Sequence, residues 1–173
     1  MNPGDIVPTA GASPDPNTRA LAYLRLAVGV LFLMFGEYKV FGTQFTLGGG
    51  FQHWIKDFLA EGAYPFMVPI LRDFVLPHGG AIAFLVAYGE LAIGLALTLG
   101  LLVRTASIFG CIYMLTLLFS ANYPGPRAAP WQYFGAALNH LVLACCFAAF
   151  ALGRPGDALS VRRYLRRLRR RAA

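Results

Sequence analysis

Four long apolar runs, separated by short polar or Pro- and Gly-containing segments, dominate the hydropathy pattern of this chain. They cover about residues 21–41, 81–103, 105–123 and 131–152. An α-helix needs about 20 consecutive apolar residues to cross a bilayer, and each run has about that length. Pro124, Gly125 and Pro126 separate the last two runs, because proline cannot continue a helix. The pattern predicts an all-α integral membrane four-helix bundle over residues 18–153.

Two shorter segments between the first two runs are neither long nor apolar enough to span. In the first, apolar residues follow helical spacing at Phe51, Trp54, Ile55, Phe58 and Leu59. In the second, over residues 64–76, apolar positions surround Arg72 and Asp73. Both are typical of short amphipathic helices at the membrane interface, where they could form a lid over the bundle. An interfacial loop with no role in a site remains the alternative.

The two ends of the chain differ from the runs between them. Residues 1–17 are polar and rich in Pro, Gly, Asp and Ser, which predicts a flexible N-terminal tail or an arm that docks a partner. The segment lacks the residue order of a cleavable signal. Residues 154–173 form a basic tail in which Val161, Tyr164, Leu165 and Leu168 share one helical stripe. This tail is expected to be an amphipathic helix on the membrane surface.

Composition and charge narrow the class of protein. Hydrophobic residues make up 57% of the 173 residues and charged residues 13%, against about a quarter charged in soluble domains. Most of the net charge of +7 comes from the tail. Beside a membrane span, such a cluster favours anionic lipid over nucleic acid, for which no motif is present. The expected lipid-binding residues are Arg162, Arg163, Arg166, Arg167, Arg169 and Arg170.

The distribution of basic residues also predicts the orientation. The N-terminal flank, the turn at Arg104 and the basic tail lie on one side of the predicted bundle, and they hold most of the arginines. By the positive-inside rule both termini are cytoplasmic. The preference for arginine over lysine, with many Ala and Gly, is consistent with a GC-rich bacterial genome. We therefore expect a multi-pass protein of the bacterial cytoplasmic (inner) membrane.

Glu90 is the acidic residue within the second apolar run. An ionised carboxylate in hydrocarbon costs at least a few kcal/mol, so Glu90 must be neutral, paired or facing a cavity. Glu90 and His140 each lie nine residues from the outer start of their runs, or roughly 13 Å deep at about 1.5 Å per residue. Asn139 and Tyr113 fall at similar depth. A contact between Glu90 and His140 or Asn139 is therefore geometrically possible.

Such a polar site suits a proton relay or the head group of a quinone. Quinone carbonyls need hydrogen-bond donors, and a buried carboxylic acid can supply a proton. The alternative is that Glu90 only joins helices by hydrogen bonding. For Tyr88 and Tyr113 we expect packing or interface roles. His140 alone is a weak signal for a haem or chlorin, since low-spin haem sites normally need two axial ligands.

No covalently bound cofactor and no metal site are expected. Cys111, Cys145 and Cys146 lie in apolar runs without a C-x-x-C pair, so packing roles are expected for them. A possible quinone is therefore the one cofactor that the sequence suggests.

Further charged and small residues lie in the runs. Arg25 either snorkels to the nearby surface or pairs with an acidic residue in the bundle. Glu37 and Lys39 are two residues apart, so each is expected to find a separate partner or to snorkel. Small residues recur every four positions in two successive stretches of the second run, which favours close packing against a neighbouring helix of this or another chain. They are Ala83, Ala87, Ala92, Ala96 and Gly100.

The segments RLAVGVLFLMFGEYK (25–39) and GELAIGLALTLGLLVRTA (89–106) resemble the DoxX-like membrane proteins, as do Asn139 and the closing GRPGDALS (153–160). The resemblance implies a four-helix bundle with a loose link to redox biology. The related DoxD proteins are subunits of thiosulfate:quinone oxidoreductase, and some DoxX proteins associate with thiol and superoxide defence enzymes. The family pattern falls here on Arg25, Lys39, Glu90, Arg104 and Asn139, whereas His140 is not assigned to it.

Three functional hypotheses follow. The first is a DoxX-like subunit of a membrane redox system, with a quinone or lipid-like ligand near Glu90. The second is a non-catalytic accessory subunit that docks partner membrane subunits, or a second copy of itself, through its small-residue and aromatic surfaces. The third is a small proton-linked transporter that uses Glu90. The candidate polar site comprises Glu90, His140, Asn139, Arg25, Lys39 and Arg104.

Overall fold

The structure, a computed structural model, describes residues 15–135, 137–153, 155, 158–161 and 164. These residues form helices and connecting segments, without a strand. The six arginines expected to bind lipid lie outside the described residues, as does nearly all of the predicted N-terminal tail. The elements are α1 (Pro16–Phe41), α2 (Thr43–Thr46), α3 (Gly50–Glu61), α4 (Met67–Pro69), η1 (Ile70–Val75), α5 (Gly79–Leu99), α6 (Val103–Ser120), α7 (Gln132–Gly135) and α8 (Leu138–Leu152).

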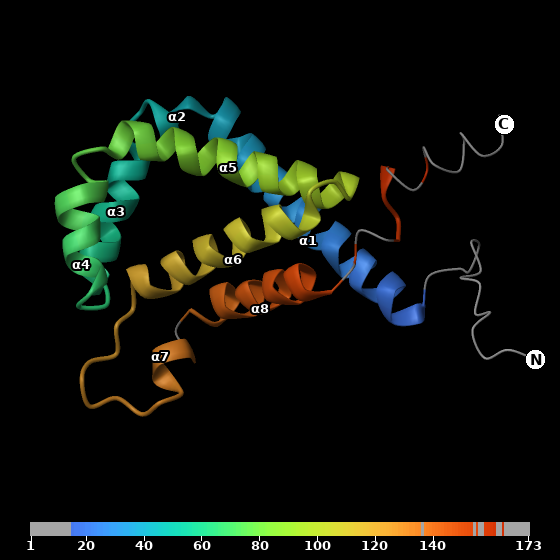
Figure 1. The fold of residues 1–173 in the computed structure, drawn as a ribbon. Coiled ribbons are helices and arrows are strands. Elements are labelled where there is room, and N and C mark those ends of the chain that lie inside the picture. Colours follow the sequence, from blue (N-terminus) through green and yellow to red (C-terminus); the bar gives the residue numbers. More distant parts are fainter. Residues whose placement is uncertain (1–14, 136, 154, 156–157, 162–163, 165–173) are drawn as a thin grey trace, which may run out of the picture.

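The long helices form two pairs, α1 with α5 and α6 with α8 (Figure 1). In the first pair, glycine brings the two backbones together. A Cβ atom at Gly36 would lie 2.6 Å from the backbone nitrogen of Leu91, and one at Gly94 would lie 2.6 Å from that of Leu33. In the second pair, Gly110 leaves room for the ring of Phe147. Small residues give membrane helices this kind of close contact.

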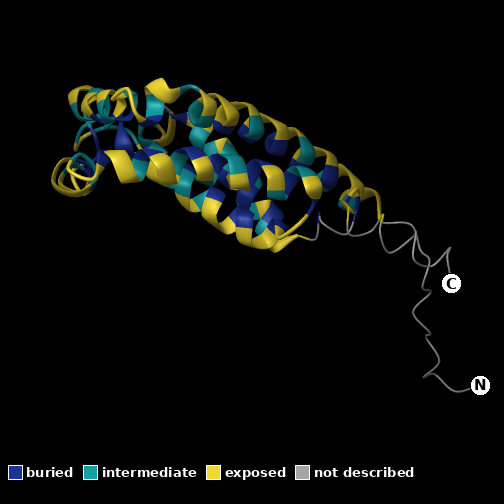
Figure 2. Cartoon of the chain, turned by 90° about the horizontal axis from the view of Figure 1, so that it is seen from above, coloured by how far each residue is buried: buried dark blue, intermediate teal, exposed yellow. Residues whose placement is uncertain are grey.

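A core of buried apolar side chains joins the two pairs. Phe32 of α1 meets Phe147 of α8 edge to face, with ring centroids 5.1 Å apart. Figure 2 shows the buried residues along the inward sides of the long helices. The members of this core are Val28, Phe32, Ile93, Leu97, Val103, Ala106, Met114, Ala144, Phe147 and Phe150.

One end of the bundle, the cap end, consists of α2, α3, α4, η1, α7 and the loop before α7 (Figure 1). Tyr64 is its centre: its backbone nitrogen donates to the carbonyl of Phe119 at 3.1 Å, and its hydroxyl donates to the carbonyl of Tyr133. Its ring lies 5.1 Å from those of Phe119 and Tyr123. Burial raises the pKa of Tyr64, and the neighbouring Tyr133 and Tyr123 add to this effect. The two short segments predicted between the first two spans are thus helical, and they pack into this cap.

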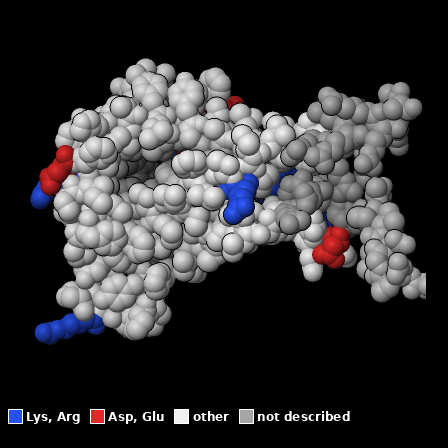
Figure 3. Space-filling model, viewed as in Figure 1, with Lys and Arg blue, Asp and Glu red and all other residues white. Residues whose placement is uncertain are grey.

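The opposite end, the turn end, holds the start of α1, the turn between α5 and α6 and the segment 158–161 (Figure 1). The sequence predicted the same grouping of segments on one side. Charged side chains are sparse on the face shown in Figure 3. Three of the described helices, α1, α5 and α6, are long and apolar enough to cross a membrane. The chain is an all-α, multi-pass membrane protein.

The fourth predicted span differs from the prediction, because residues 131–152 are not one helix. The segment contains α7 and the 15-residue α8, with Ala137 before α8 at φ −119° and ψ 43°. At about 1.5 Å per residue α8 is roughly 22 Å long, shorter than a hydrocarbon core of about 30 Å. Tyr133 explains the break. Its carbonyl accepts from Tyr64 and its hydroxyl donates to the carbonyl of Gly125 at 2.8 Å, which holds α7 in the cap.

We predict that Gly36→Ala destabilises the bundle although alanine is the better helix former. The new Cβ would lie 2.6 Å from a backbone atom of α5, so the two helices must move apart. Overpacking of this kind costs about 1–3 kcal/mol. Gly80→Ala is the matched control, because nothing lies within 4 Å of a Cβ there. Thermal unfolding in detergent should show a lower midpoint for the first variant alone, and equal midpoints would contradict the close α1–α5 contact.

Candidate functional site

Glu90 is buried in the middle of α5 and has two partners from other helices. The Nζ of Lys39 and the hydroxyl of Tyr113 each lie 2.5 Å from its Oε1. Its side chain is 6% exposed. Pairing with a cation is therefore what makes the burial of the Glu90 carboxylate tolerable in this apolar bundle. Lys39 comes from α1 and Tyr113 from α6, so the three side chains join three helices.

Lys39 reaches Glu90 from the last turn of α1, where the chain turns back into α2. The side chain is 20% exposed, and its ammonium lies 5.0 Å from the centre of the Phe45 ring. An aromatic face stabilises a cation at this distance. Phe45 and Glu90 thus both stabilise the ammonium of Lys39.

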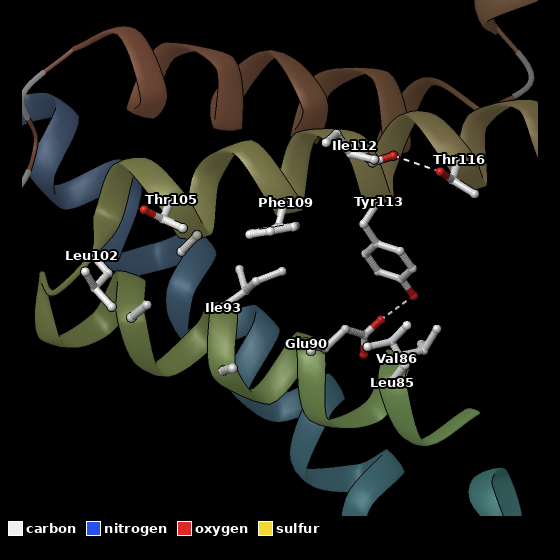
Figure 4. A pocket seen from close by; sticks show the side chains of 14 residues that line it. Leu85, Val86, Glu90, Ile93, Leu102, Thr105, Phe109, Ile112, Tyr113 and Thr116 are labelled. Atoms are coloured by element: carbon white, nitrogen blue, oxygen red, sulfur yellow. Dashed lines mark hydrogen bonds between the residues drawn. The ribbon is translucent and has the colours of Figure 1, made fainter. Parts of the chain in front are cut away.

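A groove of about 570 Å³ lies between α5 and α6, and both Glu90 and Tyr113 line it. Figure 4 shows these two side chains facing each other between the helices, with Ile93 and Phe109 beside them and Leu102 and Thr105 toward the turn end. Several lining residues, including Leu85, Phe109 and Ile112, are themselves exposed on the bundle surface. The full lining is Leu85, Val86, Gly89, Glu90, Ala92, Ile93, Ala96, Leu102, Thr105, Ala106, Phe109, Ile112, Tyr113 and Thr116.

The groove exists because α5 and α6 each pack more closely against another helix than against one another. The small residues of α5 divide between these two sides. Ala83 and Ala87 are fully buried, but Ala92 and Ala96 line the groove. These two therefore do not pack tightly against another described helix of this chain, and their packing against a helix of a partner chain stays a prediction. Their short side chains leave space, and the close contact with α1 is made on the other side of α5, at Gly94.

The polar groups of the groove are few and mostly engaged. The hydroxyl of Tyr113 donates to Glu90, and the hydroxyl of Thr116 donates to the carbonyl of Ile112 at 2.9 Å. Oε2 of Glu90 is buried and has no hydrogen-bond partner among the described residues. The groove is therefore largely apolar, with the bonded pair of Glu90 and Tyr113 as its polar centre.

His140 and Asn139 are not brought to Glu90, so the suggested contact is wrong. Both lie in the first turn of α8, which packs mainly on α6, and neither lines the groove. Nδ1 of His140 is buried without a partner among the described residues, and Asn139 is exposed. The depth estimate counted a continuous helix from Trp131, but α8 begins only at Leu138.

Arg25 is fully buried, so it does not snorkel. Its guanidinium donates to the carbonyl of Leu97 near the end of α5, to that of Leu159 at 2.8 Å and to that of Ala158 at 3.5 Å. These partners are backbone oxygens, where the sequence analysis expected a carboxylate if the side chain stayed inside. A cation is favourable at the C-terminus of a helix. Arg25 therefore joins α1, α5 and the segment after α8 at the turn end, away from Glu90.

The remaining candidates lie outside the site. Arg104 is exposed in the first turn of α6, and Glu37 is exposed on α1. The cysteines are free thiols on α6 and α8. No three His, Cys, Asp or Glu residues cluster as metal ligands within the described part of the chain.

Tyr113 is the site residue that the sequence analysis assigned to packing. Its depth in the third run was the available signal, because it matched that of Glu90. Depth alone does not give the direction of a side chain around the helix, however. The same depth estimate also placed His140 near Glu90, where the structure does not have it. The partner of Lys39 was also not identified, since Lys39 and Glu90 are 51 residues apart.

We predict that Arg25→Lys lowers thermal stability in detergent. Lysine has a single ammonium group on a flexible stem and does not reproduce the rigid fork of arginine. At least one of the three carbonyls then loses its donor, at about 1–3 kcal/mol. Arg104→Lys, at an exposed position, is the control and should unfold like the parent chain. An unchanged midpoint for Arg25→Lys would show that the three carbonyls do not depend on the guanidinium.

The Lys39–Glu90 pair is expected to be strongly coupled. Lys39→Met and Glu90→Gln should each destabilise, because each leaves a buried group without its partner. The double variant should lose less than the sum, with a coupling of about 1–3 kcal/mol. A double-mutant cycle of unfolding free energies in detergent measures this term. Additive losses would mean that the two side chains do not interact in solution.

Comparison with known proteins identifies the family of this chain. The model of the DoxX family matches residues 20–122, more than half of the chain, and the match includes Arg25, Lys39, Glu90 and Tyr113. No significant match was found among curated proteins or among solved structures. The chain therefore belongs to the DoxX family.

Proposed function

We propose that this chain binds a quinone or a similar lipid-soluble ring compound in the α5–α6 groove, as a subunit of a membrane redox system. The observation that carries the proposal is the combination of a large apolar groove with one polar centre, formed by Glu90 and Tyr113. Small-molecule sites are typically clefts of about 300–1,000 Å³ with apolar walls and a few convergent polar groups. The groove has this size and this composition.

The surface of the groove suits a ligand that arrives through lipid. Exposed apolar side chains form part of the lining, including Leu85, Phe109 and Ile112. A molecule with a long apolar tail would leave that tail among such side chains and place its polar ring at Glu90. A water-soluble substrate would have to cross the same apolar rim.

The redox role rests on the family as well as on the groove. The resemblance to DoxD proteins, which are subunits of thiosulfate:quinone oxidoreductase, supports a quinone-type ligand. The electrons would be exchanged with a partner subunit. The proposal also places the chain in the bacterial cytoplasmic membrane with both termini inside. The start of α1 and the segment 158–161 lie together at the turn end, which supports termini on the same side of the membrane.

Filling the groove tests the proposal. The full chain would be extracted gently from its native membranes as the parent and as Ala92→Phe, and the bound lipids, quinones and proteins would be identified by mass spectrometry. We expect a retained quinone in the parent chain and at least a tenfold loss in Ala92→Phe, because the new ring occupies the groove next to Glu90.

Leu95→Phe is the matched control, because Leu95 is exposed on α5 outside the groove. It should retain as much quinone as the parent chain. A stoichiometric large partner without any bound quinone would contradict the proposal, and it would favour the accessory-subunit hypothesis.

A further inference from the structure

We infer that the α5–α6 groove holds its ligand in one direction, with the polar ring beside Tyr113 and Glu90 and a long apolar chain running along α5 toward the turn end. This inference rests on the proposed function and narrows its ligand class to a ring compound that carries an extended chain. The groove differs in depth on the two sides of its polar centre, and this difference gives the direction.

The groove is deep between the polar centre and the turn end. Its floor there is formed by Ile93 of α5 and Ala106 of α6, which are each 8% exposed and belong to the core that joins the helix pairs. Figure 4 shows Ile93 and Phe109 pointing toward each other across this part, so an occupant meets apolar side chains from both helices. We call this part the tail site. It is lined by Ala92, Ile93, Ala96, Leu102, Thr105, Ala106 and Phe109.

Short side chains keep the tail site open. Ala92 and Ala96 line it from α5, and Thr105 and Ala106 line it from α6. The close contact of α5 with α1 is made at Gly94, which does not line the groove. The space in the tail site is therefore not taken by another described helix of this chain.

The groove has no comparable floor on the cap side of the polar centre. The lining residues there are Leu85, Val86 and Thr116, and none of them is buried. Leu85 is 73% exposed, and Val86 packs against the core of the cap. A chain that ran this way would lie on the surface of the bundle and would gain few contacts with the protein.

The tail site is longer than a ring that contacts the polar centre. Six residues separate Glu90 from Ala96 on α5, and eleven separate Leu102 from Tyr113. At about 1.5 Å per residue, the tail site extends roughly 9 to 16 Å from the polar centre. Its walls are as apolar as lipid, so a hydrocarbon chain would be held there by close packing contacts rather than by escape from water.

Leu102 lies where the tail site ends. Its φ of 49° is in the left-handed region, which few residues other than glycine adopt, and its side chain is 78% exposed. Thr105 lies at the same end of the groove (Figure 4). Such strained backbone is concentrated at ligand-binding and other functional sites. The turn between α5 and α6 thus places an apolar side chain at the point where the chain of the ligand would leave the groove.

Photolabelling locates the chain directly. The full-length protein in lipid nanodiscs would be irradiated with a benzoquinone whose decyl chain ends in a diazirine, with and without an excess of the same quinone lacking the diazirine. Mass spectrometry then identifies the modified residues. We expect labelling at Leu102 and Thr105 that the excess quinone suppresses. Suppressible labelling at Leu85 or Thr116 instead, or labelling only at lipid-facing residues outside the groove such as Leu95, would overturn the inference.

One substitution on each side of the polar centre tests the same direction by affinity. Ala96→Leu places a larger side chain in the tail site, so it should weaken binding of a decyl-benzoquinone about tenfold more than binding of the matching methyl-benzoquinone. Thr116→Leu, on the cap side, should leave the ratio of the two affinities as in the parent chain. The ratio is compared between proteins for the same two compounds, because a longer chain also partitions more strongly into the bilayer. An unchanged ratio in Ala96→Leu, or a change in Thr116→Leu alone, would overturn the inference.

The outcomes separate this inference from the proposed function. If both compounds bind but the chain is found elsewhere than at the turn end, the inference fails and the proposed function stands. If neither compound binds the parent chain, the proposed function fails, and the inference with it. Should Ala96→Leu not fold, photolabelling of the parent chain still decides the direction.

Discussion

The ion pair between Lys39 and Glu90 is the interaction on which the arrangement of the site depends. In an apolar bundle neither charge is tolerable alone, so α1 and α5 must hold the register in which the ammonium meets the carboxylate. The glycines between these helices allow that approach, and the ring of Phe45 lies 5.0 Å from the ammonium. Lys39 of α1 and Tyr113 of α6 meet on the same oxygen of Glu90, so this carboxylate links three helices at one point.

Much of the fold was predictable, because the hydropathy of a membrane helix is a local property. The first three predicted spans and the short amphipathic segments correspond to helices whose bounds differ by a few residues, from α1 to α6. The fourth predicted helix is interrupted, and the main reason is not local. Its first turns are apolar enough to continue a helix, but Tyr133 is bound to Tyr64, which lies 69 residues away, and to Gly125 in the preceding loop. Tertiary hydrogen bonds therefore override a pattern that hydropathy alone reads as continuous.

The site was predictable in part for the same reason. An acidic residue within an apolar run is visible in the sequence, so Glu90 could be predicted as a site residue. The partners of Glu90 could not be found in this way. Sequence gives the depth of a residue along its helix, but it does not give the direction of the side chain around the helix axis. The rotation of α6 about its axis turns Tyr113 toward Glu90, and the position of α8 behind α6 keeps His140 away. The partners of Arg25 could not be predicted either. They are backbone carbonyls, which every residue has, so no residue type in the sequence indicates them.

The bonds of Arg25 also bear on how the protein is made. Synthesis runs from the N-terminus, so α1 is complete long before the segment that carries Ala158 and Leu159. Until that segment arrives, the guanidinium lacks two of its three carbonyl partners. The first helix thus carries an uncompensated charge that only the end of the domain can satisfy. A chain that stopped before Ala158 would leave this guanidinium with one of its three carbonyl bonds, the one to Leu97.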